Sequence, residues 1–167
     1  MRGAEFRVLS SNTQREIFRV KLAEESELVA KVADLSAAAP LESEYLGLTG
    51  LSASGQLIIP YAHALNTVNN CVVLLMQYLE THPRTLPSSW EEFGVALANH
   101  HAATAENRYG WAEDNFIGAS LQQNTWSDDW VSFNQEHRLG FQLGLAQESG
   151  LLRDDESELV SMVIARL

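Results

Sequence analysis

Apolar and polar residues alternate along residues 16–21, and a second short apolar segment follows at residues 28–33. Successive side chains of a β-strand point to opposite faces, so alternation is typical of a strand with one buried face. The residues between the two segments, 23–27, are mostly polar. This pattern predicts a β-hairpin.

The next segment has the spacing of a helix. Leu41, Tyr45, Leu48 and Leu51 recur every three or four residues, which predicts an amphipathic helix. Two further apolar runs, at residues 57–62 and 71–78, have the length of strands, and a turn-rich stretch at residues 66–70 separates them. The predicted order is strand, strand, helix, strand, strand.

The character of the chain changes near residue 80, which predicts a first domain at 1–80 and a second at 81–167. A Pro- and Ser-rich linker leads to a helix at 90–105, for which Ser88 or Ser89 is the expected N-cap. A loop rich in polar residues spans 108–125. A long helix then covers 126–149 and ends at Gly150, and Asp154 opens a last helix.

Composition narrows the possible functions. Eleven Lys and Arg residues stand against 22 Asp and Glu, so the 167-residue chain carries a formal charge of −11, which disfavours nucleic acid as a partner. No apolar stretch reaches the ~18 residues that cross a bilayer, and the N-terminus does not resemble a signal peptide. The single cysteine, Cys71, excludes an intramolecular disulfide framework. We expect a cytoplasmic protein with no membrane partner.

Several polar and aromatic residues have both a functional and a structural interpretation. Lys31 on an edge strand facing solvent is the ordinary interpretation of a lysine in this pattern. His100 and His101 lack the further ligands of a metal site, so a core or capping histidine is favoured. Trp130 is expected to pack in the core, whereas Trp126 is left open. Four polar residues of the loop have two interpretations: they bind sugar hydroxyls, or they form hydrogen bonds with the loop backbone. They are Asp114, Asn115, Gln122 and Asn124.

The first domain resembles the N-terminal lobe of a protein-kinase-like fold. Leu28-Val29-Ala30-Lys31-Val32 is similar to the V-A-I-K strand, whose lysine meets the α- and β-phosphates of ATP. Glu44, in the following helix, corresponds to the carboxylate that pairs with this lysine. The run 74–79 resembles a kinase hinge: Met76 closes the back of the adenine pocket, and the backbone of Gln77 and Leu79 bonds the base.

The second domain resembles the fructosamine-3-kinase (ketosamine-3-kinase) family in residue type and spacing. The resemblance rests on Tyr109-Gly110-Trp111, Asp114-Asn115-Phe116-Ile117-Gly118, Gln122, Asn124-Thr125-Trp126, Asp129-Trp130, Phe133 and His137-Arg138-Leu139. It implies an α+β fold: a small antiparallel-sheet lobe with one helix, followed by the beginning of a helical lobe.

The family transfers the γ-phosphate of ATP to the O3 hydroxyl of a ketoamine sugar on an amine, including glycated lysine, and so begins protein deglycation. The resemblance therefore implies ATP and Mg²⁺ as cofactors and a ketoamine as substrate. Lys31, Glu44, Met76, Gln77 and Leu79 are the expected nucleotide-binding residues. The expected substrate-binding residues are Asp114, Asn115, Gln122, Asn124 and Trp126.

The sequence departs from the family at its chemical centre. Phosphoryl transfer needs a base-like aspartate and metal ligands, which this family carries in an H-G-D-x-x-x-x-N segment and a later aspartate. The 167 residues contain no such segment, so no catalytic or metal-ligating residue is expected. Residues 10–15 also lack the glycines of a phosphate-binding loop.

These departures predict an N-terminal portion of a kinase that does not catalyse by itself. The alternatives are a non-catalytic half-kinase that binds a ligand or partner, and another small-molecule kinase of the aminoglycoside and choline kinase superfamily. The motifs at 114–124 and 126–138 argue against that superfamily alternative.

Overall fold

The computed structural model describes residues 3–12, 15–23, 25–82 and 87–167. The chain divides into two compact units, Met1–Ala105 and Glu106–Leu167. The lobe boundary expected near residue 80 precedes the helix that ends the first unit, and the division into lobes stays a prediction.

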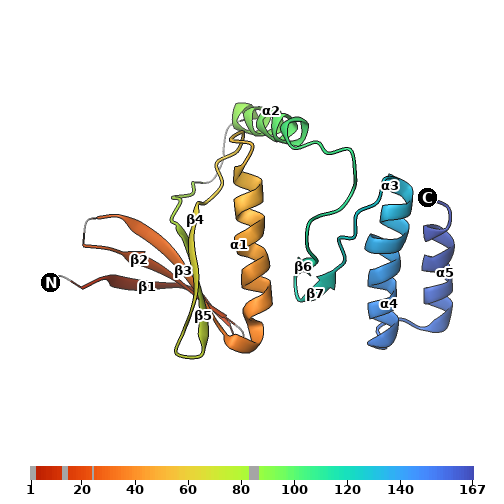
Figure 1. The fold of residues 1–167 in the computed structure, drawn as a ribbon, viewed down its shortest axis with the longest axis horizontal. Coiled ribbons are helices and arrows are strands. Elements are labelled where there is room, and N and C mark those ends of the chain that lie inside the picture. Colours follow the sequence, from red (N-terminus) through yellow and green to blue (C-terminus); the bar gives the residue numbers. More distant parts are fainter. Residues whose placement is uncertain (1–2, 13–14, 24, 83–86) are drawn as a thin grey trace. The chain divides into compact units, whose positions relative to one another are not determined.

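The first unit is built on a five-stranded antiparallel sheet with the order β1-β2-β3-β5-β4 (Figure 1). The predicted hairpin is confirmed as β2 and β3, with Val20 opposite Leu28. Strand β1 was not predicted, and its residues are all exposed. The strands are β1 (Glu5–Ser11), β2 (Arg15–Lys21), β3 (Glu27–Asp34), β4 (Ala62–Val68) and β5 (Cys71–Gln77).

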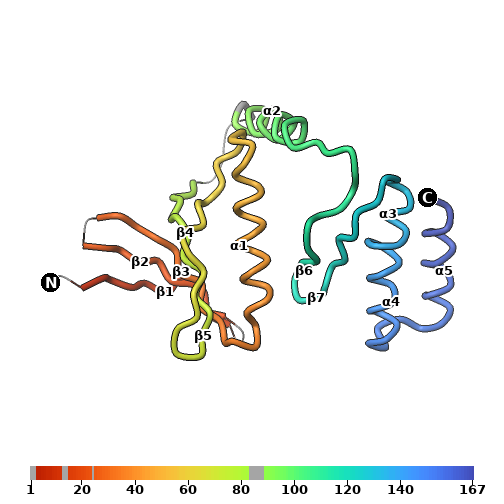
Figure 2. The backbone as a smooth tube through the Cα atoms, in the orientation of Figure 1, coloured from red at the N-terminus to blue at the C-terminus, as the bar shows by residue number. Residues whose placement is uncertain are grey.

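One face of this sheet packs against a helix. A short 3₁₀ turn, η1 (Leu35–Ala37), leads from β3 into α1 (Ala38–Ser52), which contacts β3, β4 and β5 (Figures 1 and 2). The predicted helix at 41–51 is therefore confirmed. The core between the two layers contains Ala33, Leu41, Val72, Leu74 and Met76. Burial of this apolar surface fixes the helix on the sheet.

The prediction of a strand at residues 57–62 is wrong. Strand β4 begins at Ala62 and continues through residues that the sequence pattern assigned to a turn. Pro60 has no N–H to donate to a ladder, which disfavours a strand there. The turn itself is reduced to Asn69 and Asn70, whose φ angles of 47° and 66° suit a two-residue hairpin between β4 and β5.

The helix α2 (Pro87–Ala103) ends the first unit. It begins at Pro87, so Ser88 and Ser89 lie in its first turn and the expected N-cap role is wrong. Proline is well suited to the first helical position because its missing N–H has no partner there. Residues 83–86 of the predicted linker lie outside the described residues.

The second unit combines a small hairpin with helices. Strands β6 (Asn115–Ile117) and β7 (Ser120–Gln122) pair within the segment expected to be a loop. The long helix begins at Trp130 rather than at residue 126, as α3 (Trp130–Phe133), and the last helix is α5 (Asp154–Ile164). The predicted start of the long helix at residue 126 is wrong, because the backbone of Asp129 is extended. The Asp129 side chain instead caps the helix by accepting the N–H of Ser132 at 2.6 Å.

The middle of the long helix is a π-helical segment, η2 (Asn134–Gly140), which α4 (Phe141–Glu148) continues. A Cβ at Gly140 would collide with the carbonyl oxygen of Gln135, so the wide turn depends on glycine there. The predicted end at Gly150 is confirmed: its φ is 65°, and its N–H donates to the Gln147 carbonyl at 2.9 Å.

The cap at Asp129 makes stability depend on pH. The N–H of Ser132 stabilises the carboxylate and lowers the pKa of Asp129 below its ordinary value of 3.8. A lowered pKa in the folded state adds stability at neutral pH that disappears as pH falls through that pKa. We expect Asp129→Asn to melt at a lower temperature at neutral pH, with a difference that shrinks below about pH 4. Thermal unfolding at several pH values tests this, and a constant difference down to the acid limit would contradict it.

Candidate nucleotide and substrate sites

The lysine of the kinase-like strand meets its expected partner. The Lys31 Nζ atom donates to Glu44 Oε1, which joins β3 to α1 by an ion pair. The two side chains are 19% and 27% exposed, so the pair is shielded but open to solvent on one side. An ammonium held in this way presents a fixed positive charge to an anion, and phosphate is the anion that the kinase-like pattern predicts.

The sheet topology excludes the ordinary interpretation of Lys31. Strand β3 is central and pairs with β2 on one side and β5 on the other, so this lysine does not lie on an edge. Ile17 and Leu74 are its ladder partners. A charge on a half-buried central strand needs a counter-charge, which Glu44 supplies.

The expected hinge segment, residues 76–80, begins at the end of β5. Met76 is buried on the core face of the sheet, two residues from Leu74, the ladder partner of Lys31. The N–H of Gln77 donates to the Tyr61 carbonyl at 2.8 Å. Among the described residues, the N–H of Leu79 has no acceptor. The N–H of Leu79, the residue predicted to bond the base, is therefore available to a ligand.

An arginine that the sequence motifs did not single out also contacts this segment. The Arg19 guanidinium lies 4.1 Å from the centre of the Tyr78 ring and bonds Glu27 Oε2 at 2.5 Å. The hydrogen bond to Glu27 raises the pKa of Arg19 above its ordinary value. The sequence signal was the position of Arg19, two residues after Ile17 and on the same strand face.

In the second unit, the polar residues expected to bind substrate bond one another. The Asn124 N–H donates to Asp114 Oδ1 at 2.8 Å, and its side-chain amide donates to the Glu113 carbonyl at 2.9 Å. Arg138 donates to Asn124 Oδ1 at 2.7 Å and also to the Gln123 carbonyl. Asn124 is 2% exposed, so its bonds hold the loop on η2. Their role in binding stays a prediction.

Two other expected substrate residues stand across the β6–β7 hairpin from each other. Gln122 Nε2 donates to Asn115 Oδ1 at 3.0 Å. This bond joins a directly opposed pair of the ladder and fixes its register. Both side chains are half-buried, so each keeps part of its surface in contact with solvent.

Trp126 presents part of its ring to solvent, with 37% of the residue exposed. Arg108 lies 5.5 Å from its ring centre and is paired with Asp128 at 3.1 Å. Gly110 has a φ of 147°, and a Cβ there would lie 3.0 Å from the Trp126 ring and 2.8 Å from the Asn124 carbonyl. Glycine at this position therefore lets the chain approach Trp126 closely.

Trp130 packs less completely than expected. Its ring contacts Tyr109 at 5.2 Å and Phe133 at 6.3 Å between centroids, yet 56% of the residue is exposed. Phe133 is the buried member of this cluster, and Arg138 lies 4.3 Å from its ring centre. Burial lowers the pKa of Arg138 from its ordinary value.

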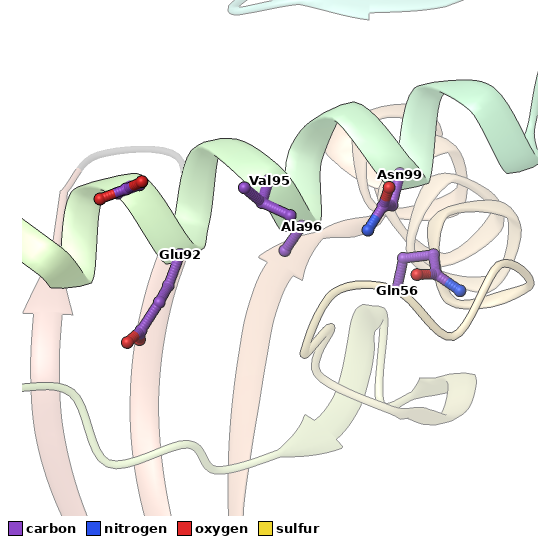
Figure 3. Close-up of a pocket in the computed structure, with 6 residues that line it drawn as sticks. Gln56, Glu92, Val95, Ala96 and Asn99 are labelled. Atoms are coloured by element: carbon purple, nitrogen blue, oxygen red, sulfur yellow. The ribbon is translucent and has the colours of Figure 1, made fainter.

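One cavity of the first unit is not lined by Lys31. It has a volume of about 420 Å³ and is formed by the segment after α1 and by α2 (Figure 3). His100, next to Asn99 in the chain, is buried, and its Nδ1 atom lies 2.6 Å from Ser54 Oγ, which confirms a core histidine there; His101 is exposed, so a core position is wrong for it. The lining residues are Gln56, Glu91, Glu92, Val95, Ala96 and Asn99.

Among the described residues, no group of three or more His, Cys, Asp or Glu side chains could hold a metal ion. None of the helices in the described ranges combines the length and the apolar character needed to span a bilayer.

Comparison with known proteins gives a consistent result. The family model described as "Fructosamine kinase" matches residues 7–167. A "Probable ketoamine kinase" of Vibrio cholerae is 42% identical over 94 residues, which are 56% of this chain and 33% of that protein. The "Protein-ribulosamine 3-kinase, chloroplastic" of Oryza sativa is 34% identical over 106 residues, covering 62% and 30% of the two chains.

Solved structures show the same fold. One described as a "Putative fructosamine-3-kinase" from Haemophilus somnus has a TM-score of 0.82 at 23% identity, over 97% of this chain and 54% of that one. Another, from Thermobifida fusca, has a TM-score of 0.79 at 27% identity, over 98% and 55%. The α+β, kinase-like fold is thereby confirmed. The chain spans about a third of these curated relatives and slightly more than half of the solved structures.

The Asn124 network predicts a large loss of stability for Asn124→Ala. The substitution removes the amide partners of Arg138 and of the Glu113 carbonyl in a buried place, which costs about 2–4 kcal/mol of unfolding free energy. As a control, Gln122→Ala removes one half-buried bond and costs at most about 1 kcal/mol. Urea unfolding measures both values. Equal losses would show that Asn124 does not organise the loop.

Proposed function

The chain belongs to the fructosamine kinase family, and on that premise we propose that it serves the transfer of the γ-phosphate of ATP to O3 of a ketoamine sugar carried on an amine. The observation that most supports this proposal is the Lys31–Glu44 ion pair on the central strand of the sheet. Such a pair has the charge and the shielding needed to position a triphosphate.

Each nucleotide-binding residue has a physical role in this proposal. Lys31 contacts the α- and β-phosphates, and Glu44 fixes the direction of its ammonium group. Met76 closes the inner end of the adenine site. The carbonyl of Gln77 accepts from the base, and the N–H of Leu79 donates to it. Because backbone atoms make these last contacts, the site selects adenine by geometry rather than by side-chain identity.

The residues present bind the nucleotide without completing the chemistry. The described residues offer no cluster of acidic or histidine ligands for Mg²⁺, and the sequence contains no H-G-D-x-x-x-x-N segment. We therefore assign no step to a metal and no base to the substrate hydroxyl. Residues 1–167 by themselves are expected to bind ATP and to transfer no phosphate.

The second unit supplies the proposed substrate contacts. Trp126, with part of its ring exposed, offers an apolar face to a sugar ring, and Gln122 and Asn115 offer amide groups to its hydroxyls. Asp114 and Asn124 act behind them by holding the loop. We propose that this activity is cytoplasmic.

Lys31→Ala is expected to weaken ATP binding by about 10- to 100-fold, the value of a lost charge-assisted contact to phosphate. Lys21→Ala is the matched control, because Lys21 is the other lysine of the chain and is exposed at the end of β2. Calorimetric titration of ATP into each variant gives the affinities, and thermal unfolding without ligand shows that each is folded.

Two results would decide against the proposal. Equal ATP affinity for the wild-type chain and Lys31→Ala would place the nucleotide elsewhere. Phosphate transfer to a ketoamine by residues 1–167, lost in Lys31→Ala, would show that the chain contains catalytic groups outside the H-G-D-x-x-x-x-N motif.

A further inference from the structure

Three segments of the first unit meet at the side chain of Arg19. Arg19 lies on β2 opposite Val29 of β3, and its guanidinium reaches Glu27 at the start of β3 at 2.5 Å. The same guanidinium stacks 4.1 Å from the ring centre of Tyr78, directly after β5. One planar cation thus joins β2, β3 and the beginning of the hinge segment.

Glu27 joins Tyr78 a second time through the backbone. The Tyr78 N–H donates to the Glu27 carbonyl at 3.4 Å, while the Glu27 carboxylate holds Arg19. The long backbone bond is weak by itself. The ring of Tyr78 is held instead by the guanidinium, whose charge the carboxylate balances. Side chain and backbone therefore fix Tyr78 from two directions.

The position of Tyr78 gives this arrangement a consequence for ligand binding. Tyr78 stands between Gln77 and Leu79, whose backbone groups are the proposed readers of the nucleobase. The N–H of Gln77 is fixed on the other side by the Tyr61 carbonyl at 2.8 Å. The contacts of Tyr78 with Arg19 and Glu27 are therefore the main restraint on rotation of the peptide units between Gln77 and Leu79.

We propose that Arg19 is a positioning residue for the nucleobase: its contacts with Tyr78 and Glu27 hold the backbone of residues 77–79 in the orientation that reads adenine. This inference rests on the proposed nucleotide-binding function. Arg19 itself does not touch the base in this account, and it acts through Tyr78. The group of three residues, Arg19, Glu27 and Tyr78, is called the hinge clasp below.

Arginine suits this place better than lysine. Its planar group can stack on a ring and bond a carboxylate at the same time, whereas an ammonium is a compact point charge with no stacking face. Arg19 is 29% and Glu27 26% exposed in their side chains, so solvent weakens the ion pair without dissolving it. An isolated pair at this exposure adds little to global stability, so a local role in ordering the hinge is the larger effect.

The test compares Arg19→Gln with Arg7→Gln. Arg7 is the ladder partner of Arg19 on the neighbouring strand β1 and is exposed, so both variants remove one charge from adjacent positions of the sheet. Two ligands are titrated into each: ATP, and inorganic tripolyphosphate, which has the phosphates without the base. Amide hydrogen exchange is followed at Gln77 and Tyr78 without ligand.

For Arg19→Gln we expect ATP affinity to fall about tenfold, tripolyphosphate affinity to stay within about twofold, and exchange at Gln77 and Tyr78 to accelerate about tenfold. Tyr78→Leu, which removes the ring, should reproduce these changes. Arg19→Lys keeps the charge but not the stacking plane, so its ATP affinity should lie between those of the wild type and Arg19→Gln. Arg7→Gln should match the wild type in every measurement.

Different results would overturn the role of the hinge clasp and the proposed nucleotide-binding function. If wild-type chain binds ATP but Arg19→Gln binds it equally well, or loses both ligands in the same proportion, the clasp does not position the base. If exchange at Gln77 and Tyr78 is unchanged in Arg19→Gln, the clasp does not order the hinge. A wild-type chain that binds neither ligand overturns the proposed function and the nucleobase role of the clasp with it.

Discussion

The ion pair between Lys31 and Glu44 is the constraint on which the first unit depends. A lysine in the middle of a five-stranded sheet can be accommodated only if a carboxylate comes to it, because an unpaired charge at a shielded position is costly. The helix that brings this carboxylate is held by the apolar core around Leu41 and Leu74. The same burial that stabilises the fold therefore also sets the direction of the ammonium group.

The second unit depends on a different charge. Arg138, on the π-helical segment, donates to the backbone of Gln123 and to the side chain of Asn124. Asn124 in turn donates hydrogen bonds to the Asp114 carboxylate and the Glu113 carbonyl. One guanidinium therefore orders a loop that has little apolar core of its own. Asn124 lies two residues after the end of the β6–β7 hairpin and two residues before the partly exposed Trp126. In both units a cation on a strand or helix is paired with a polar group that another segment of the chain supplies.

The sequence was sufficient for those parts of the fold that periodicity encodes. The alternation in β2 and β3 and the spacing of Leu41, Tyr45 and Leu48 gave the correct elements, and family resemblance supplied the partner of Lys31. The strand at 57–62 failed because apolar content does not reveal that Pro60 interrupts a ladder. The register of β4 was instead set by the left-handed turn at Asn69 and Asn70.

Side-chain networks were the least predictable features. Nothing in the pattern distinguishes Asn124, which is buried and bonded on every side, from Gln122, which remains half-exposed. The contact of Arg19 with Tyr78 joins residues 59 positions apart along the chain and depends on the sheet order rather than on local spacing. The π-helical segment was equally hidden, because its wide turn depends on the close approach of Gln135 to Gly140.

A double-mutant cycle on Lys31 and Glu44, read out as ATP affinity, tests most directly whether the ion pair forms the phosphate site. Glu44→Gln should weaken binding in the chain that retains Lys31, and should change it little once Lys31→Met is present, because the carboxylate acts through the ammonium group. Independent, additive losses from the two substitutions would contradict the account, since they would mean that the two side chains contribute to binding separately.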